Sequence, residues 1–518
     1  MIKHNSIGIL PTKRKDKGMK MSNISEHKLR KGLSIWQVVG LSVALMAPSM
    51  AANINPQGAA SAAGRAVPLA FLFAAVGVLF VAYVFVRLTQ YFNHSGSVFG
   101  FVGATLGPRA GVIAGWSLMG TYISYALVTC IASSIFASSL LQSLGVWKNP
   151  PVWAPFALGA VELFLVWLMA IRPAKNATHF LLSVEGTTVA LILLISVIVL
   201  VKLVGGHGPQ GQHFTLSVFS LAKGTSSSSL FLGVVFGFLS FAGFEASATL
   251  GEEANKPRRD IPRAILGTAI FGGIYFVFVT SIESMGFGTS TKEVAAFVSS
   301  GSLLGDLGTT YVASWIGNLI TLGTVISAFG CALASTVGAS RLMYAINRDG
   351  VGIGPLTKIS AKYETPTSST TVVVAIVAVI AALSAIAFGA KPFDEFSWFG
   401  TIGTLIILVV YLLATLGTVY LLFISGKVKV PQWEIILPLI AIGILGYTIY
   451  RNVVPYPTGV FAWMPIASGA WILIALVAVI AAPAMAKRAG EHLTMEEGLL
   501  PVSSAYDLTD TVEPIHGN

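Results

Sequence analysis

Four acidic residues lie inside long apolar segments of the chain: Glu162, Glu185, Glu245 and Glu283. A carboxylate at membrane depth is costly, and such residues typically bind a cation, carry a proton or pair with a polar neighbour. Glu283 lies near a segment end, which favours a place at the membrane rim, and we expect Glu162 to pack against a polar neighbour. Glu185 and Glu245 are therefore the stronger candidates for chemistry.

These acids stand out because charge is scarce in the chain. Only 10% of the 518 residues are charged, whereas 54% are hydrophobic, and ordinary soluble domains carry about 25% charged residues. A large soluble protein is excluded, and an all-helical integral membrane protein is predicted. The formal net charge of +10 comes partly from a basic N-terminal tail without interleaved aromatic residues, so we expect no nucleic-acid partner.

A membrane-spanning helix needs about 20 mainly apolar residues, and the chain has twelve segments of this kind. They cover residues 35–63, 67–86, 112–141, 152–171, 177–201, 230–250, 264–287, 311–334, 370–389, 396–424, 435–450 and 463–482. Lys and Arg are concentrated in the tails and in the loops on the same side, which the positive-inside rule makes cytoplasmic. We expect a multi-pass protein of the cell membrane with cytoplasmic tails at 1–34 and 486–518.

Two of these segments are interrupted near their middle. Pro48 removes a backbone hydrogen bond and clashes with the preceding turn, so the first helix should break or bend near Ala47. In the sixth segment, Gly243 and Glu245 interrupt an apolar run. Freed backbone groups at membrane depth survive where they line a cavity or are covered by protein. A simple proline kink is the alternative interpretation of Pro48 alone.

The two interruptions occupy corresponding positions in two halves of five segments each, at 35–201 and 230–424. Such a pair is the sequence indication of an inverted-repeat transporter whose binding site lies at the bilayer midplane. The segments within 435–482 add two further helices to this arrangement.

Several motifs resemble the amino acid, polyamine and organocation (APC) transporter superfamily. They are Phe241-Ala-Gly-Phe-Glu245, the following loop from Glu252 to Ile265, the stretch from Ser340 to Gly350, and the stretch from Gly107 to Trp116. The resemblance covers nearly the whole chain. It implies an amino acid permease with a leucine-transporter-like 5+5 inverted repeat, with helices 1 and 6 interrupted, that works by alternating access.

The resemblance also implies which residues line the substrate cavity. The first break contributes Ala47, Pro48, Ser49, Met50 and Ala51, and the second contributes Phe241, Ala242, Gly243 and Glu245. The N-terminal end of a half-helix offers free N–H groups to a substrate carboxylate, and unwound carbonyls accept from an ammonium group. Tyr122 and Tyr125 of the third segment are further candidates.

The chain departs from the superfamily pattern at two places. Many members have a Gly-Ser-Gly-like break where this chain has Pro48-Ser49-Met50, which leaves the substrate open. Many members also have a Lys where this chain has Glu185, and that Lys is thought to replace a coupling cation. The reversed charge at Glu185 should change ion coupling rather than the fold.

Two coupling ions are compatible with these residues. A buried carboxylate can load and release a proton, so we expect proton coupling through Glu185 or Glu245. The alternative is sodium, held by carbonyls near Ala44 and Ala47 together with Ser335 and Thr336. An amino acid is the expected substrate, and the alternatives are an organic amine such as ethanolamine, putrescine or a γ-amino acid, or an exchange of such substrates.

Other functional classes find less support in the sequence. The eight histidines have no metal-ligand spacing, and neither an HExxH motif nor a GxxxxGK[ST] loop is present. We therefore expect no catalytic residues, no metal and no cofactor, and hence no enzyme. A channel can also use broken helices and remains an alternative. We expect a monomer or a weak oligomer in the lipid bilayer.

Overall fold

The structure is a computed structural model. It describes residues 34–92, 98–172, 177–250, 254–348, 353–363, 365–426, 428, 430–484 and 486–488. The tails expected at 1–34 and 486–518 therefore lie outside the described residues, except for Ser34 and for residues 486–488.

The described residues form helices and no β-strand. The helices of the N-terminal part are α1 (Ile35–Met46), α2 (Pro48–Ala63), α3 (Val67–Tyr91), α4 (Val98–Leu106), α5 (Pro108–Ser143), α6 (Ala154–Ala170) and α7 (Ala177–Val204). The following helices are α8 (Ser227–Phe241), the 3₁₀ turn η2 (Ala246–Leu250), α9 (Pro257–Phe287), α10 (Thr291–Val298), α11 (Leu303–Tyr311), α12 (Ser314–Ile346), α13 (Thr367–Ala387) and α14 (Pro392–Val419). The last two helices are α15 (Ile436–Arg451) and α16 (Trp463–Ala481).

Eleven helical segments among the described residues are long and apolar enough to cross a membrane. They coincide with eleven of the twelve apolar segments of the sequence, when α1 with α2, and α8 with η2, are each taken as one segment. The twelfth segment, at 152–171, contains α6, which is apolar but has 17 residues. An all-helical membrane protein is thus confirmed.

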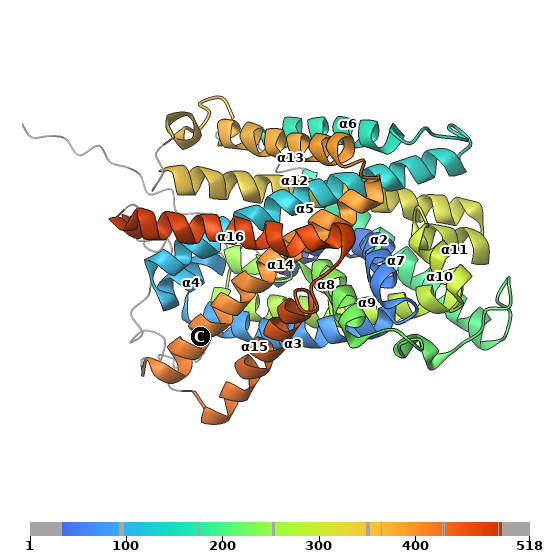
Figure 1. The fold of residues 1–518 in the computed structure, drawn as a ribbon, viewed down its shortest axis with the longest axis horizontal. Coiled ribbons are helices and arrows are strands. Elements are labelled where there is room, and N and C mark those ends of the chain that lie inside the picture. Colours follow the sequence, from blue (N-terminus) through green and yellow to red (C-terminus); the bar gives the residue numbers. More distant parts are fainter. Residues whose placement is uncertain are drawn as a thin grey trace, which may run out of the picture.

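The short helices α4, α10 and α11 fall outside the apolar segments. Figure 1 shows α4 at one end of the bundle and α10 and α11 at the other. α10 begins with a capping box in which Ser290 and Glu293 satisfy each other's backbone amides, which is a common helix start. The sequence analysis did not predict these helices.

Helices from the two halves of the chain pack against one another. α2 packs on α8, α3 on α9, α5 on α12 and α6 on α13, and Figure 1 shows α6 and α13 side by side along one edge. Large aromatic side chains fill the interior between these pairs; Phe71 and Phe241, for example, both pack against Phe276. This packing brings the middle of α2 and the end of α8 together.

Candidate functional site

The first interruption lies between α1 and α2. Ala47 has the left-handed backbone angles φ 43° and ψ 59°, which are costly for a residue with a side chain. Pro48 occupies the first position of α2 and has no N–H to donate. The amide of Ala51 is already bonded to the carbonyl of Ala47 at 2.9 Å. Helix α1 therefore ends at Met46, and α2 begins at Pro48.

The second interruption follows α8. The helix ends at Phe241, Gly243 has φ 97°, and the 3₁₀ turn η2 starts at Ala246. A glycine is required at 243 for two reasons. Its positive φ disfavours any side chain, and a Cβ there would lie 2.7 Å from Cβ of Leu45.

The two interruptions pack against each other. Gly243 lies against the last turn of α1, at Leu45 and Met46, and the amide of Ser247 donates to Oγ of Ser42 at 3.0 Å. Irregular backbone from two distant segments thus meets at one place inside the bundle. This is an arrangement in which freed backbone groups can bind a small polar ligand.

Ser49 and Glu185 are joined directly at this place. The amide of Ser49 donates to Oε1 of Glu185, and its hydroxyl donates to Oε2, both at 2.8 Å. Both residues are buried. Glu185 of α7 thereby accepts two hydrogen bonds from the first turn of α2, where the helix dipole favours a negative charge.

A second carboxylate, that of Glu245, lies in the unwound stretch after α8 and is buried. Its Oε2 has no hydrogen-bond partner among the described residues. Tyr122, Tyr125 and Tyr411 lie close enough to interact electrostatically with this carboxylate. The hydroxyl of Tyr411 faces this carboxylate and makes no close hydrogen bond with any described residue.

Helix α12 closes another side of the site. Sγ of Cys331 donates to the carbonyl of Leu45 at 3.4 Å, at the end of α1, and Cys331 also interacts with Glu185. Ser335 and Thr336 are buried on the same helix. Oγ1 of Thr336 has no hydrogen-bond partner among the described residues.

The predicted site residues are therefore placed as follows. Ala47, Pro48, Ser49, Met50 and Ala51 are all buried at the first break, and Ala242, Gly243 and Glu245 lie at the second. The ring of Phe241 packs edge-on against Phe276 of α9, with centroids 5.3 Å apart. Of the predicted residues, Ser49 and Glu185 are linked to each other by hydrogen bonds.

Sequence reasoning missed Asn53, which lies one turn after Ser49 on α2. Its Nδ2 donates to the carbonyl of Ser49 at 3.0 Å and to Oγ1 of Thr324 at 3.1 Å. Its Oδ1 accepts from Oγ of Ser302 at 3.0 Å and from the amide of Leu304 at 2.9 Å. The four-residue spacing from Ser49, which places both on one helix face, was the available signal.

Tyr275, Tyr411 and Glu283 were also missed or undervalued. The hydroxyl of Tyr275 donates to the carbonyl of Pro48 at 3.4 Å, and Tyr411 lies beside Glu245. Glu283 is fully buried, and neither carboxylate oxygen has a hydrogen-bond partner among the described residues. Its expected place at the rim does not match this burial.

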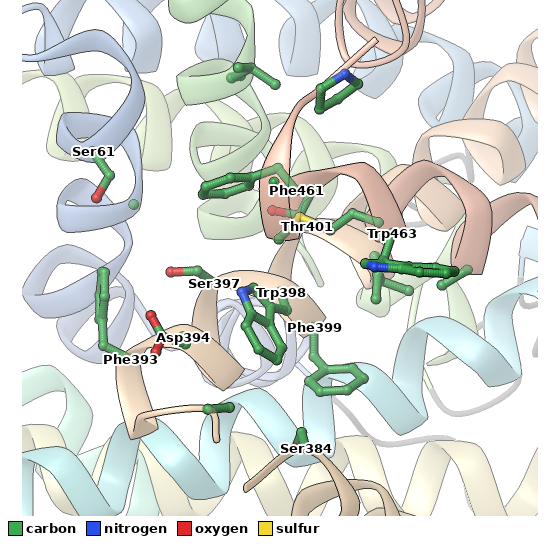
Figure 2. A pocket seen from close by; sticks show the side chains of 18 of the residues that line it. Ser61, Ser384, Phe393, Asp394, Ser397, Trp398, Phe399, Thr401, Phe461 and Trp463 are labelled. Carbon is green, nitrogen blue, oxygen red and sulfur yellow. The ribbon is translucent and has the colours of Figure 1, made fainter. Parts of the chain in front are cut away.

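A cavity of about 1190 Å³ lies at the end of the bundle where α2 and α13 end and where α8, α14 and α16 begin. Figure 2 shows its aromatic side chains Trp398, Phe399, Phe461 and Trp463, with the hydroxyls of Ser61 and Ser397. Phe236 also lines the cavity, and its ring occupies the space where a Cβ of Gly58 would lie. Phe236 and Gly58 thus pack closely at the wall of this cavity.

Comparisons with known proteins agree with this architecture. The family model described as "Amino acid permease" matches residues 38–493. The "Low-affinity putrescine importer PlaP" of Escherichia coli (strain K12) is 27% identical over 336 residues, which is 64% of this chain and 69% of that protein. The "Branched-chain amino acid permease BcaP" of Bacillus subtilis (strain 168) is 25% identical over 362 residues, 67% of this chain and 73% of that protein. The "Methylthioribose transporter" of the same organism is 23% identical over 329 residues, 60% of this chain and 66% of that protein.

Proposed function

The chain belongs to the amino acid permease family, and from this premise we propose that it is a secondary active transporter that carries amino acids or related amines by alternating access. The names of its relatives cover both chemistries, since one is a putrescine importer and another is a branched-chain amino acid permease. Transport of a small polar solute also fits a membrane protein with two buried carboxylates at its centre.

The observation that supports this proposal most directly is the meeting of the two helix interruptions. The end of α1 lies against Gly243, and Ser247 donates to Ser42. Paired interruptions at membrane depth are typical of transporters built from inverted repeats. The packing of α2 on α8, α3 on α9, α5 on α12 and α6 on α13 suits a 5+5 repeat, with α6 as the twelfth membrane crossing.

In this proposal the substrate lies between the two breaks. Ala47, Pro48, Ser49, Met50 and Ala51 form one wall, and Phe241, Ala242, Gly243 and Glu245 form the other. The outer cavity beside Phe236 is the proposed entrance, because the cytoplasmic orientation inferred from Lys and Arg places that end outside. Both termini are then cytoplasmic in the cell membrane.

We assign the coupling ion as a proton carried by Glu185 or Glu245. Both carboxylates are buried and lie at the helix breaks, so a change in their charge would alter how α2 and α8 pack. The competing assignment is sodium, bound by carbonyls near Ala44 and Ala47 with Ser335 and Thr336. Oγ1 of Thr336 is buried and has no hydrogen-bond partner among the described residues, so this oxygen is available to a sodium ion.

Uptake by reconstituted protein tests both parts of the proposal. Proteoliposomes should accumulate a labelled amino acid or amine under an inward pH gradient, and the uptake should saturate and be stimulated by substrate on the opposite side. Conductance that rises linearly with substrate would instead identify a channel. Uptake that follows a sodium gradient and ignores pH would overturn proton coupling. A Glu185→Gln variant should exchange substrate but lose its pH dependence if Glu185 carries the proton.

A further inference from the structure

We infer that the transported substrate is an amine that lacks an α-carboxylate, because the position where a substrate carboxylate would bind is already filled by Glu185. The inference rests on the proposed transport function and specifies its substrate class. It follows from the hydrogen bonds at the start of α2, from the charge of the site and from the surroundings of Glu245.

The start of α2 offers few amides to an anionic ligand. Pro48 has no N–H, and the amide of Ala51 is bonded to Ala47. The amide and the hydroxyl of Ser49 both donate to Glu185, each at 2.8 Å. Among the residues of the first turn of α2, from Pro48 to Ala51, Met50 alone has an amide left to offer a ligand. An incoming carboxylate would therefore have to displace Glu185 or bind through one amide beside a negative charge.

The charge of the site leads to the same conclusion. Glu185 and Glu245 are both buried there. The ion pair found within the described part of the chain joins Arg87 to Glu434, on α3 and just before α15, so no described Lys or Arg forms an ion pair with either carboxylate. When Glu185 and Glu245 are ionised, a ligand carboxylate at the start of α2 would meet like charge with no cation of the described residues beside it, which disfavours its binding.

The surroundings of Glu245 suit an ammonium group. The carboxylate of Glu245 and the hydroxyl of Tyr411 face each other, and Oε2 and this hydroxyl make no close hydrogen bond with any described residue. An ammonium group, which has three donors to offer, can bind between them. The rings of Phe85 and Phe244 pack edge-on against Tyr411, with centroids 5.6 and 5.9 Å away, so Tyr411 is held in place. Tyr122 and Tyr125 lie close enough to interact electrostatically with the same carboxylate.

Glu185, Glu245 and the neighbouring tyrosines therefore have different roles in the site. Glu185 occupies the helix start and excludes a second carboxylate there. Glu245 accepts hydrogen bonds from the ammonium, and the tyrosines surround it. A primary amine with an apolar or aminoalkyl chain meets these requirements, whereas its parent amino acid has one carboxylate too many.

The decisive experiment compares amino acids with the amines that their decarboxylation produces, since each pair has the same side chain. Suitable pairs are ornithine with putrescine, lysine with cadaverine, and leucine with isoamylamine. Dissociation constants are measured by thermal shift on the purified full-length protein, and uptake is measured in proteoliposomes. We expect the amine to bind at least tenfold more tightly in every pair that gives a signal. A smaller or reversed preference in any such pair would overturn the inference.

Variants test the role of Glu185 separately. Glu185→Ala frees the amide of Ser49, so the ratio of affinities should shift at least tenfold toward the amino acid. In Glu185→Gln the side-chain carbonyl can still accept from Ser49 but the negative charge is gone, so the ratio should shift in the same direction and by less than in Glu185→Ala. Glu162→Gln, a buried carboxylate on α6, is the matched control and should leave the ratio unchanged. An unchanged ratio in a folded Glu185→Ala protein would contradict the inference.

The outcomes distinguish this inference from the proposed function. Preferential uptake of amino acids would leave the transport function intact and overturn the substrate class alone. Uptake of neither member of any pair would overturn the transport function and the inference with it. If Glu185→Ala does not fold, the comparison of pairs on the unmodified protein still decides the substrate class.

Discussion

The carboxylate of Glu185 accepts two hydrogen bonds from Ser49, one from the amide and one from the hydroxyl, each 2.8 Å long. The two residues are 136 positions apart in the chain, and both are buried. This link ties the first third of α7 to the first turn of α2, at the point where the first membrane segment is interrupted. Substitutions here should therefore change stability and transport together.

Replacing Ser49 by Ala removes the hydroxyl donor and keeps the amide donor. Hydrogen bonds to charged groups contribute about 1.5–3 kcal/mol, so the free energy of unfolding should fall by roughly that amount and uptake should fall with it. The measurement is the unfolding midpoint in detergent together with proteoliposome uptake. Ser49→Thr retains the hydroxyl and should lose less of both. Equal losses in the two variants would show that the hydroxyl is unimportant.

Asn53→Ala should destabilise the protein more than Asn55→Ala. Asn53 makes four hydrogen bonds, among them the one that satisfies the buried amide of Leu304 at the start of α11. Asn55 donates to Oγ of Ser240 at 2.7 Å, and its Oδ1 has no partner among the described residues. Each buried group left unsatisfied costs about 1–3 kcal/mol.

Unfolding midpoints of these two asparagine variants give the comparison. Hydrogen exchange should in addition show faster exchange of the Leu304 amide in Asn53→Ala only. Similar destabilisation by the two variants, with protection of Leu304 unchanged, would argue against a tether between α2 and α11.

Gly243→Ala should abolish transport, because the residue cannot take a side chain. Its φ of 97° is unfavourable for alanine, and the new Cβ would lie 2.7 Å from Cβ of Leu45. The left-handed conformation alone costs roughly 1–2 kcal/mol, and the overlap adds to it. Uptake and the unfolding midpoint are both expected to fall.

Gly446→Ala on α15 is the matched control for this glycine. A Cβ there would have no neighbour within 4 Å, and alanine favours a helix over glycine by up to about 1 kcal/mol. This variant should retain uptake and be slightly more stable. Normal transport by Gly243→Ala would show that the second interruption does not need its observed backbone.

The capping box of α10 should make this helix sensitive to acid. Hydrogen bonds from the amide and hydroxyl of Ser290 lower the pKa of Glu293 below its ordinary value. A lowered pKa in the folded state means that the stabilisation is complete above the ordinary glutamate pKa of about 4.3. It is lost as the pH falls through the lower pKa of the folded state.

Hydrogen exchange of the first turn of α10, corrected for the intrinsic effect of pH, should therefore show protection that declines below about pH 4.3. Glu293→Gln can still cap the helix but does not titrate, so its protection should not vary with pH over this range. A decline of equal size in both proteins would assign the acid sensitivity to another group.

Much of the fold was predictable because each membrane segment is specified by its own residues. A run of about 20 apolar residues in lipid has to form a helix, since no water is available to satisfy its backbone. The helices α3, α5, α9 and α12 accordingly start and end within about a dozen residues of the predicted segments. The interruption at Ala47 was predictable for a similarly local reason, because Pro48 lacks an N–H.

Short helices and polar partners were less predictable. α4, α10 and α11 are too short to cross a membrane, and the apolar pattern therefore did not indicate them. Tyr275 and Tyr411 lie within long apolar segments, where a single tyrosine is as compatible with packing as with a site. Their neighbours Pro48 and Glu245 come from other segments of the chain.

By itself, the sequence determined that the chain crosses a membrane many times, that two segments are interrupted, and that Glu185 and Glu245 are buried charges to be explained. It also offered the N-terminal end of the second half-helix as the place for the carboxylate of a substrate. Only the tertiary structure decided that Glu185 lies there, bonded to Ser49. The physical reason is that the free energy of placing a segment in lipid depends on the residues of that segment itself. The partner of a buried charge depends instead on how helices that are distant in the chain pack together.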